Sequence, residues 1–173
     1  MAPSENPIED VFLPGGKLRE EVFTKPAYLA LHESLRFARD TCWESLRSPH
    51  IFMGLLFVAD GGVKNWGDRL GADLPRLLDQ FLELFLQEEG EKEPYLNLNR
   101  EFLSDNVIRL LRDAYYRAKY HCREQISTMD LLISLFTANN SIVAECFERS
   151  IGVTAAKLTE LAVIAEQNSQ QKF

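Results

Sequence analysis

The sequence predicts an all-α fold built from two four-helix repeats related by a pseudo-twofold axis, and three observations support this. Eight segments start at residues that cap helices and stop at glycine or another helix-ending residue. No segment shows the sustained apolar–polar alternation of a half-buried strand. The order of caps, apolar positions and stopping glycines in the first half returns in the second half.

The first repeat is expected over residues 23–86, after an irregular extension at residues 1–22 that holds three of the seven prolines. One helix starts at the cap Thr24 and passes Ala38, and three more are expected at 48–59, 63–70 and 74–87. The expected caps and stops of these three are Ser48, Gly61-Gly62, Gly71 and Asp73. Because the helix from Ser48 is apolar almost all round, it should lie at the centre of its repeat.

The second repeat is expected over residues 102–166, between an acidic linker at 87–101 and a tail at 167–173. Its first helix starts at the cap Ser104 and passes Ala118. The other three are expected at 129–138, 142–150 and 155–165, with Thr128 and Thr154 as caps and Gly152 as a stop. Each element therefore has a counterpart in the first repeat.

The two halves align at an offset of 80 residues. The aligned pairs are Thr24 and Ser104, Leu31 and Leu111, Ala38 and Ala118, Cys42 and Cys122, Ser48 and Thr128, and Leu55 and Leu135. One extra residue then brings Gly71 onto Gly152. This agreement of caps, core positions and stops indicates a duplicated four-helix unit.

Composition excludes several classes of function. The net charge of −7 comes mainly from residues 1–22 and 87–101, each at −3, and no basic stripe is present for binding nucleic acid. The longest apolar run has nine residues, whereas a membrane span needs about 20. The first residues lack the features of a secretory signal, and three cysteines are too few for a disulfide scaffold. We therefore expect a cytoplasmic protein.

The segment Leu46–Leu56, Leu-Arg-Ser-Pro-His-Ile-Phe-Met-Gly-Leu-Leu, resembles the signature of the Clp ATPase N-terminal (double Clp repeat) domain family. The turn at 69–74 and the opening Phe23-Thr24 are also similar to that family, and residues 126–135 and 151–153 give a weaker second copy. The resemblance implies an eight-helix Clp N-domain-like fold without a cofactor. It also implies a role in docking peptides, protein substrates or adaptor proteins for a Clp-type ATPase, in cis or in trans.

Two departures from the family bear on function. Members that read phosphorylated arginine use the Glu of a Thr-Glu-His motif in both halves, but here those positions are Pro49 and Met129. Neither side chain accepts a hydrogen bond from a guanidinium group. The chain also lacks a phosphate-binding loop, because its only Gly-Lys is followed by Leu18. We therefore expect a peptide groove that favours apolar side chains, near Phe23, Pro49, Phe102 and Met129.

No residue pattern predicts catalysis or metal binding. His50 follows a helix start and is interpreted as structural, and His121-Cys122 lacks further ligands at short spacing. The carboxylates at 88–93 lie in a polar stretch and are interpreted as solvated. The main hypothesis is a non-enzymatic binding module. Alternatives are a small helical ligand sensor or enzyme with a site in the inter-repeat cleft, and a subunit that serves only homo-oligomerisation.

Overall fold

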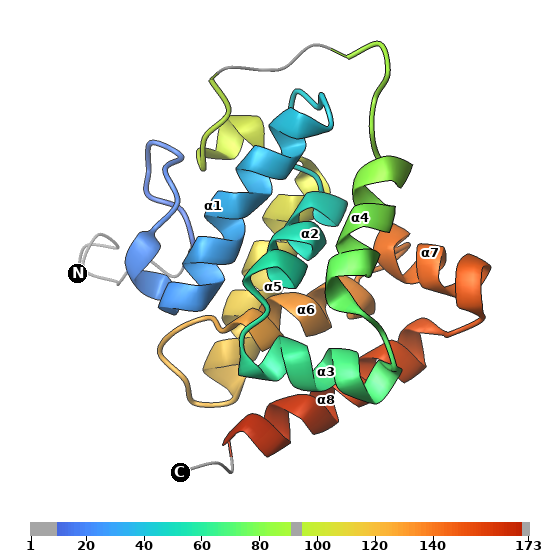
Figure 1. The fold of residues 1–173 in the computed structure, drawn as a ribbon. Helices are drawn as coiled ribbons and strands as arrows, with labels where there is room; N and C mark the ends of the chain where they lie inside the picture. Colours follow the sequence, from blue (N-terminus) through green and yellow to red (C-terminus); the bar gives the residue numbers. More distant parts are fainter. Residues whose placement is uncertain (1–9, 91–94, 171–173) are drawn as a thin grey trace.

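The computed structural model describes residues 10–90 and 95–170, which form eight α-helices joined by short loops (Figure 1). The helices are α1 (Lys25–Asp40), α2 (Ser48–Val58), α3 (Gly61–Leu70), α4 (Leu74–Leu84), α5 (Asp105–Tyr120), α6 (Thr128–Thr137), α7 (Ile142–Ile151) and α8 (Ala155–Gln170). Within these residues β-structure is limited to isolated bridges. The all-α prediction with four helices in each half is therefore confirmed. Parts of the predicted extension, linker and tail, at 1–9, 91–94 and 171–173, lie outside the described residues.

The apolar helices α2 and α6 lie at the centre of the molecule, whereas the prediction placed the helix from Ser48 at the centre of its own repeat. Every residue from Pro49 to Leu56 is buried, and so is every residue from Thr128 to Phe136. Phe52 of α2 contacts four aromatic rings from four other helices, with ring centroids 4.9–6.3 Å apart; they are Trp66, Phe81, Phe136 and Phe147. Since these rings come from both halves, the two repeats share one hydrophobic core.

The repeats exchange main-chain hydrogen bonds at two equivalent places. The segment before α5 pairs with the segment before α2, and the segment before α1 pairs with the segment before α6. The four bonds are Leu46 N to Phe102 O (2.8 Å), Ser104 N to Leu46 O (3.0 Å), Ile126 N to Val22 O (2.8 Å) and Thr24 N to Ile126 O (2.9 Å). Each repeat therefore places the start of the other repeat's central helix.

The positive φ angles of the backbone follow the same duplication. The equivalent pairs, with φ in degrees, are Cys42 (63) and Cys122 (59), Ala59 (44) and Asn140 (56), and Gly71 (75) and Gly152 (70). Left-handed residues thus recur after α1 and α5, between α2 and α3 and between α6 and α7, and after α3 and α7, although non-glycine residues adopt this conformation at some cost. Cys42 and Cys122 follow the ends of α1 and α5; Cys42 is half-buried, and Cys122 is exposed.

Several helix boundaries differ from the prediction. Gly61-Gly62 does not end α2; it forms the first turn of α3, because the Asp60 carboxylate accepts a hydrogen bond from Val63 N at 3.2 Å. The N-cap positions of α2 and α6 are Arg47 and Ser127, one residue before those predicted. At their far ends, α4 stops at Leu84 and α8 continues to Gln170.

The starts of α2 and α6 use different side chains in the same position. His50 Nδ1 accepts from Arg47 N at 3.0 Å, and Asp130 Oδ2 accepts from Ser127 N at 2.8 Å. Because His50 Nδ1 is an acceptor, the ring proton sits on Nε2, which lies 3.1 Å from Thr41 Oγ1. Burial, with a smaller effect from Arg47, lowers the His50 pKa to about 3, so the ring is neutral.

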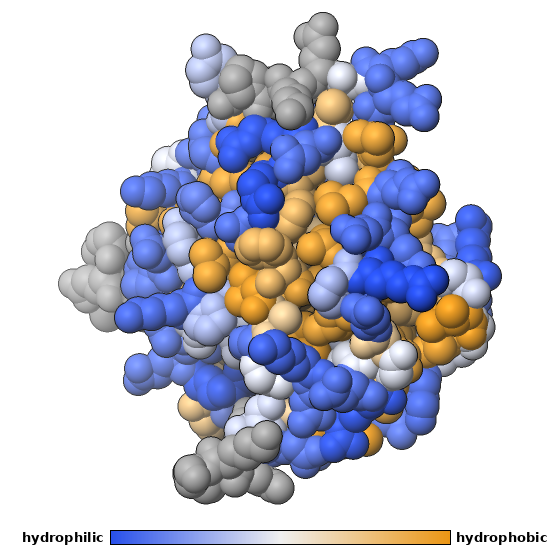
Figure 2. Space-filling view, viewed as in Figure 1, coloured by the Kyte–Doolittle hydropathy of each residue, from blue (hydrophilic) through white to orange (hydrophobic). Residues whose placement is uncertain are grey.

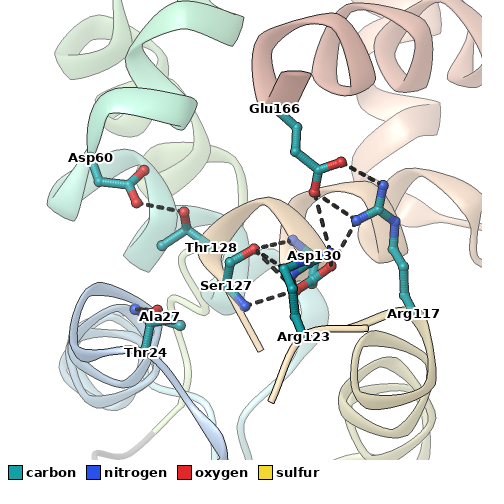
Figure 3. Close-up of polar contacts among 9 residues, drawn as sticks. All are labelled: Thr24, Ala27, Asp60, Arg117, Arg123, Ser127, Thr128, Asp130 and Glu166. Carbon is teal, nitrogen blue, oxygen red and sulfur yellow. Dashed lines mark hydrogen bonds and ion pairs between the residues drawn. The ribbon is translucent and has the colours of Figure 1, made fainter. Parts of the chain in front are cut away.

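Asp130 is fully buried and belongs to an ion cluster that ties α8 to the rest of the second repeat (Figure 3). Its carboxylate accepts hydrogen bonds from Arg123 and, at 2.7 Å, from Arg117. Arg117 also makes a two-pronged bond to Glu166 of α8, at 2.7 and 2.9 Å. Burial raises the pKa of Asp130, but these hydrogen bonds outweigh it and lower the pKa overall. Asp130 therefore stays charged at neutral pH.

The described part of the N-terminal extension is more ordered than predicted. Val11, Phe12 and Leu18 are buried, whereas Leu13 is 39% exposed. The segment around Leu18 pairs with the end of the linker through Leu18 N to Leu98 O (3.1 Å) and Arg100 N to Gly16 O (2.8 Å). Arg112 of α5 holds Asp10 through two bonds of 3.0 Å. The extension is thus fastened to the second repeat.

Leu55 and Leu135 are 0% and 2% exposed in the shared core, so truncating either side chain should lower the stability by a similar amount. Replacing either by alanine should cost about 2–5 kcal/mol of unfolding free energy, through lost transfer energy and a residual cavity. Urea denaturation followed by circular dichroism measures this loss. Leu29→Ala, at a position 50% exposed, is the control and should cost far less. A loss below about 0.5 kcal/mol at either buried leucine would contradict the repeat alignment.

His50 predicts a defined dependence of stability on pH. Its pKa is below that of the unfolded chain, so the unfolded state binds the proton first. The stability it contributes is complete above about pH 6.5 and is lost as the pH falls toward 3. Between pH 8 and pH 5 the loss should be about 2 kcal/mol. His50→Asn should be less stable at pH 8 but should lose less over this range; an unchanged pH slope would refute the buried neutral ring.

Asp130→Asn should cost about 3–5 kcal/mol, because it leaves two arginines facing a site without its anion. Asp113→Asn is the control, since Asp113 is exposed on α5 and makes no ion pair within the described residues. Thermal unfolding at pH 7 compares the two variants. Equal melting temperatures would show that the cluster contributes no net stability.

Candidate functional site

The four residues predicted to line a peptide groove fall into two pairs, one at each place where the repeats exchange hydrogen bonds. Phe102 O accepts from Leu46 N, three residues before Pro49. Phe23 forms a bridge with Ile126, three residues before Met129. We name these places the Pro49 junction (Leu46, Pro49, Phe102 and Ser104) and the Met129 junction (Phe23, Thr24, Ile126 and Met129). The structure does not bring all four predicted residues into one groove.

Most of the four side chains are buried. Phe23 is 3% and Met129 is 4% exposed, Pro49 is buried, and Phe102 is half-buried. Phe23 lies at the edge of an open hollow of 450 Å³ beside Tyr28 and Leu29. The surfaces available to a ligand are therefore set by the neighbours of the predicted residues.

The Pro49 junction contains a small pocket of 70 Å³, which we name the Pro49 pocket. It is lined by Trp43, Arg47, Ser48, Pro49, His50, Phe85, Ser104, Asn106 and Ile142. Trp43 is held in place because its Nε1 donates to Phe85 O at 2.6 Å and its ring meets the His50 ring edge-on. A cavity needs at least about 10–15 Å³ to hold one water, so this pocket is large enough to admit a small group such as the end of one side chain.

A second, polar pocket of 120 Å³ adjoins the first and shares Ser48, Asn106 and Ile142 with it. We name it the Asn106 pocket; its remaining lining is Arg109, Leu110, Asp113, Leu135, Thr137, Ala138, Asn139, Asn140 and Ser141. Arg109 and Asp113 are exposed and form no ion pair in the part of the chain that the structure describes. Side-chain amides and a free guanidinium group are thus available beside an apolar pocket.

Within residues 10–90 and 95–170, no pocket like the Pro49 pocket opens at the Met129 junction, where two contacts fill the space. Thr128 Oγ1 donates to Asp60 Oδ2 at 2.6 Å (Figure 3). Met129 packs on α3 so closely that a Cβ on Gly62 would lie 2.8 Å from its Cγ and Sδ. The helix caps do not distinguish the two junctions, because Thr24 Oγ1 accepts from Ala27 N at 3.3 Å and Ser104 Oγ accepts from Val107 N at 3.2 Å.

Repeat equivalence shows why one junction is open. The counterpart of Asp60 is Ser141, which caps α7 through its single oxygen at 3.1 Å from Ala144 N. Ser141 has no second oxygen to reach Ser48, as Asp60 reaches Thr128. The counterpart of Gly62 is Val143, which is fully buried. Substitution at the starts of α3 and α7 therefore leaves the Pro49 junction hollow.

Ile142 and Asn106 were not among the predicted site residues. Ile142 is 42% exposed at the first position of α7, where the equivalent residue of α3 is Gly61. An apolar residue placed directly after a helix cap is the sequence signal that could have identified it. Asn106 lies in the first turn of α5, and nothing in its local pattern distinguishes it from other polar helix residues.

The geometry of the site supports contact and hydrogen bonding. His50 has both ring nitrogens engaged, and its lowered pKa leaves it neutral. Within residues 10–90 and 95–170, no three His, Cys, Asp or Glu side chains gather closely enough to hold a metal ion. No helix in these ranges has the length and apolar character needed to cross a membrane.

Known proteins share this fold. The N-terminal domain of the caseinolytic protease associated chaperone ClpD from Arabidopsis thaliana superposes with a TM-score of 0.67 at 17% identity, covering 88% of this chain and 99% of that domain. The Hsp104 N-terminal domain from Candida albicans gives a TM-score of 0.65 at 13% identity, covering 87% and 93%. Curated proteins give no sequence match.

The match at the level of sequence families spans α1 to α7. Residues 22–150 fit the Clp repeat (R) N-terminal domain family, and they include both junctions and both central helices. The two superposed domains, the duplicated helices and this family match agree. The chain belongs to the Clp repeat N-terminal domain family.

Proposed function

We propose that this chain is a docking domain that binds an exposed segment of a protein substrate or adaptor on behalf of a Clp-type ATPase. The ATPase is supplied in cis or in trans, and the complex works in the cytoplasm. The observation that carries the proposal is the open Pro49 junction, where an apolar pocket and a polar pocket adjoin at the family's motif. The family match supports a substrate- or adaptor-docking role.

The pocket chemistry favours an apolar side chain. Trp43, Phe85 and Ile142 supply apolar surface, and Pro49 supplies no acceptor where the motif of phosphoarginine readers has Glu. Arg47 stacks on Trp43 with its guanidinium carbon 5.2 Å from the ring centre, which places positive charge at the pocket wall. A bound arginine would meet that charge without an anion to balance it.

The adjoining polar pocket suits the main chain of the same peptide. Asn106, Asn139 and Asn140 offer amide groups that both donate and accept hydrogen bonds. Binding should be weak, because a small pocket must offset the entropy lost when a flexible segment is ordered. ATP should neither bind tightly nor be hydrolysed by this chain alone, since it lacks the loop that surrounds phosphates.

The preference for an apolar residue can be measured with one peptide made in three forms, with leucine, arginine or phosphoarginine at its central position. The leucine peptide should bind most tightly. Trp43 fluorescence reports binding at the pocket, because the other tryptophan, Trp66, is fully buried away from it. If phosphoarginine binds tenfold more tightly, a difference of about 1.4 kcal/mol, the proposed preference is wrong.

The location can be tested with exposed positions. Ile142→Asp should weaken leucine-peptide binding at least tenfold, because it places a charge at the shared edge of both pockets. Tyr116→Asp, at a position 57% exposed on α5, is the matched control and should leave binding unchanged. Binding that resists Ile142→Asp would place the peptide elsewhere. Pro49→Glu combined with Met129→Glu tests the motif positions; gain of phosphoarginine binding would confirm that they face the ligand.

A further inference from the structure

The pseudo-twofold symmetry breaks at one pair of helices. Helix α8 of the second repeat lies along α3 of the first repeat (Figure 1). Trp66 Nε1 of α3 donates to Leu158 O of α8 at 3.3 Å. The equivalent helices are α4 and α7, and these stand apart. A groove of 590 Å³ separates them.

The groove is apolar and open. Its buried floor contains Phe81 and Phe147, and its edges carry Leu84 and Ile151, which are 61% and 60% exposed. The full lining is Leu70, Gly71, Ala72, Asp73, Arg76, Leu77, Gln80, Phe81, Leu84, Cys146, Phe147, Ser150 and Ile151. Figure 2 shows apolar side chains reaching the surface over α2 and α4, and again at the right of the view where α7 lies.

Side-chain size explains why α4 does not close on α7. The residues of α8 equivalent to Phe81 and Leu84 are Ala162 and Ala165, which are fully buried. Small residues allow close approach of two helices, whereas Phe81 and Leu84 hold α4 away from α7. The face of α7 that corresponds to the α8-covered face of α3 is therefore uncovered. The packing of α8 on α3 shows that a helix can cover the equivalent face in the other repeat.

The charges in the groove indicate the character of a partner. Only Asp73 and Arg76 among the lining residues are charged. The Asp73 carboxylate is engaged in capping α4, where it accepts from Arg76 N at 3.3 Å. The Arg76 guanidinium is exposed and makes no ion pair in the ranges that the structure describes. A partner with a carboxylate at this edge would supply the missing opposite charge.

We propose that the groove between α4 and α7 binds an amphipathic helix of a partner protein, with a row of large apolar side chains and an acidic residue beside that row. The apolar row lies over Phe81 and Phe147, between Leu84 and Ile151, in the manner of helix-in-groove recognition. The acidic residue pairs with Arg76. This groove shares no lining residue with the Pro49 pocket, so it is a second docking surface.

The test uses two synthetic helical peptides with leucine at every third or fourth position, one with glutamate and one with lysine along the same edge. Fluorescence anisotropy should show the glutamate peptide binding at least fivefold more tightly. Arg76→Glu should reverse this preference, because it inverts the charge at the edge. Bound peptide should also slow alkylation of Cys146, which lines the groove, relative to exposed Cys122, as read by mass spectrometry.

Surface variants separate this groove from other surfaces. Leu84→Glu and Ile151→Glu should each weaken binding at least tenfold, and both positions are exposed enough to leave the fold intact. Leu29→Glu, at an exposed position on α1, should have no effect. Ile142→Asp should also have no effect here, so failure of the Pro49 pocket proposal is distinguishable. The proposal is overturned if neither peptide binds, if Arg76→Glu keeps the preference, or if light scattering shows a dimer that Leu84→Glu dissociates.

Discussion

Two short main-chain pairings between the repeats determine where both central helices begin. Leu46 and Ile126 each receive hydrogen bonds from, and give them to, the segment that opens the opposite repeat. Neither repeat can therefore set the start of its own central helix alone. Since α2 and α6 form the middle of the shared core, the aromatic cluster around Phe52 depends on this exchange. The Pro49 pocket lies at one of these junctions, where chain segments from both repeats meet.

The two repeats have the same backbone arrangement but carry a neutral and a charged side chain at equivalent positions. His50 and Asp130 accept the same main-chain bond at the start of α2 and α6, yet one is a neutral ring and the other a carboxylate. The neighbouring residues differ in the same way. Trp43 contacts the neutral His50, and Arg123, the residue equivalent to Trp43, pairs with the charged Asp130. A buried charge is stable only with such partners. Arg117 and Arg123 also reach Glu166, so α8, which lies outside the family match, is joined by charge to the helices within it.

Much of the fold was predictable because helix caps and apolar spacing act over a few residues. The order of eight helices, the offset between repeats and the burial of Leu55 and Leu135 all follow from such local signals. The extension was not predictable in this way, since Leu18 is ordered by a bond to Leu98, 80 residues along the chain. For the peptide site, the sequence predicted the region around the starts of the two central helices but not the residues that line the pockets. Whether a junction is open depends on contacts such as Thr128 with Asp60, which join residues far apart in sequence.

Closure of the Met129 junction has a consequence for valency. A duplicated domain with two open junctions could hold two segments of one ligand, and the second contact would then benefit from a high effective concentration. In the part of the chain that the structure describes, a pocket opens at the Pro49 junction, whereas Thr128 bonds to Asp60 and fills the Met129 junction. Under the proposed function, a ligand that repeats the segment bound at the Pro49 junction would gain avidity at these junctions when several copies of the chain are gathered on one assembly. The affinity measured on the isolated chain would then be lower than the affinity of an assembly that holds several copies.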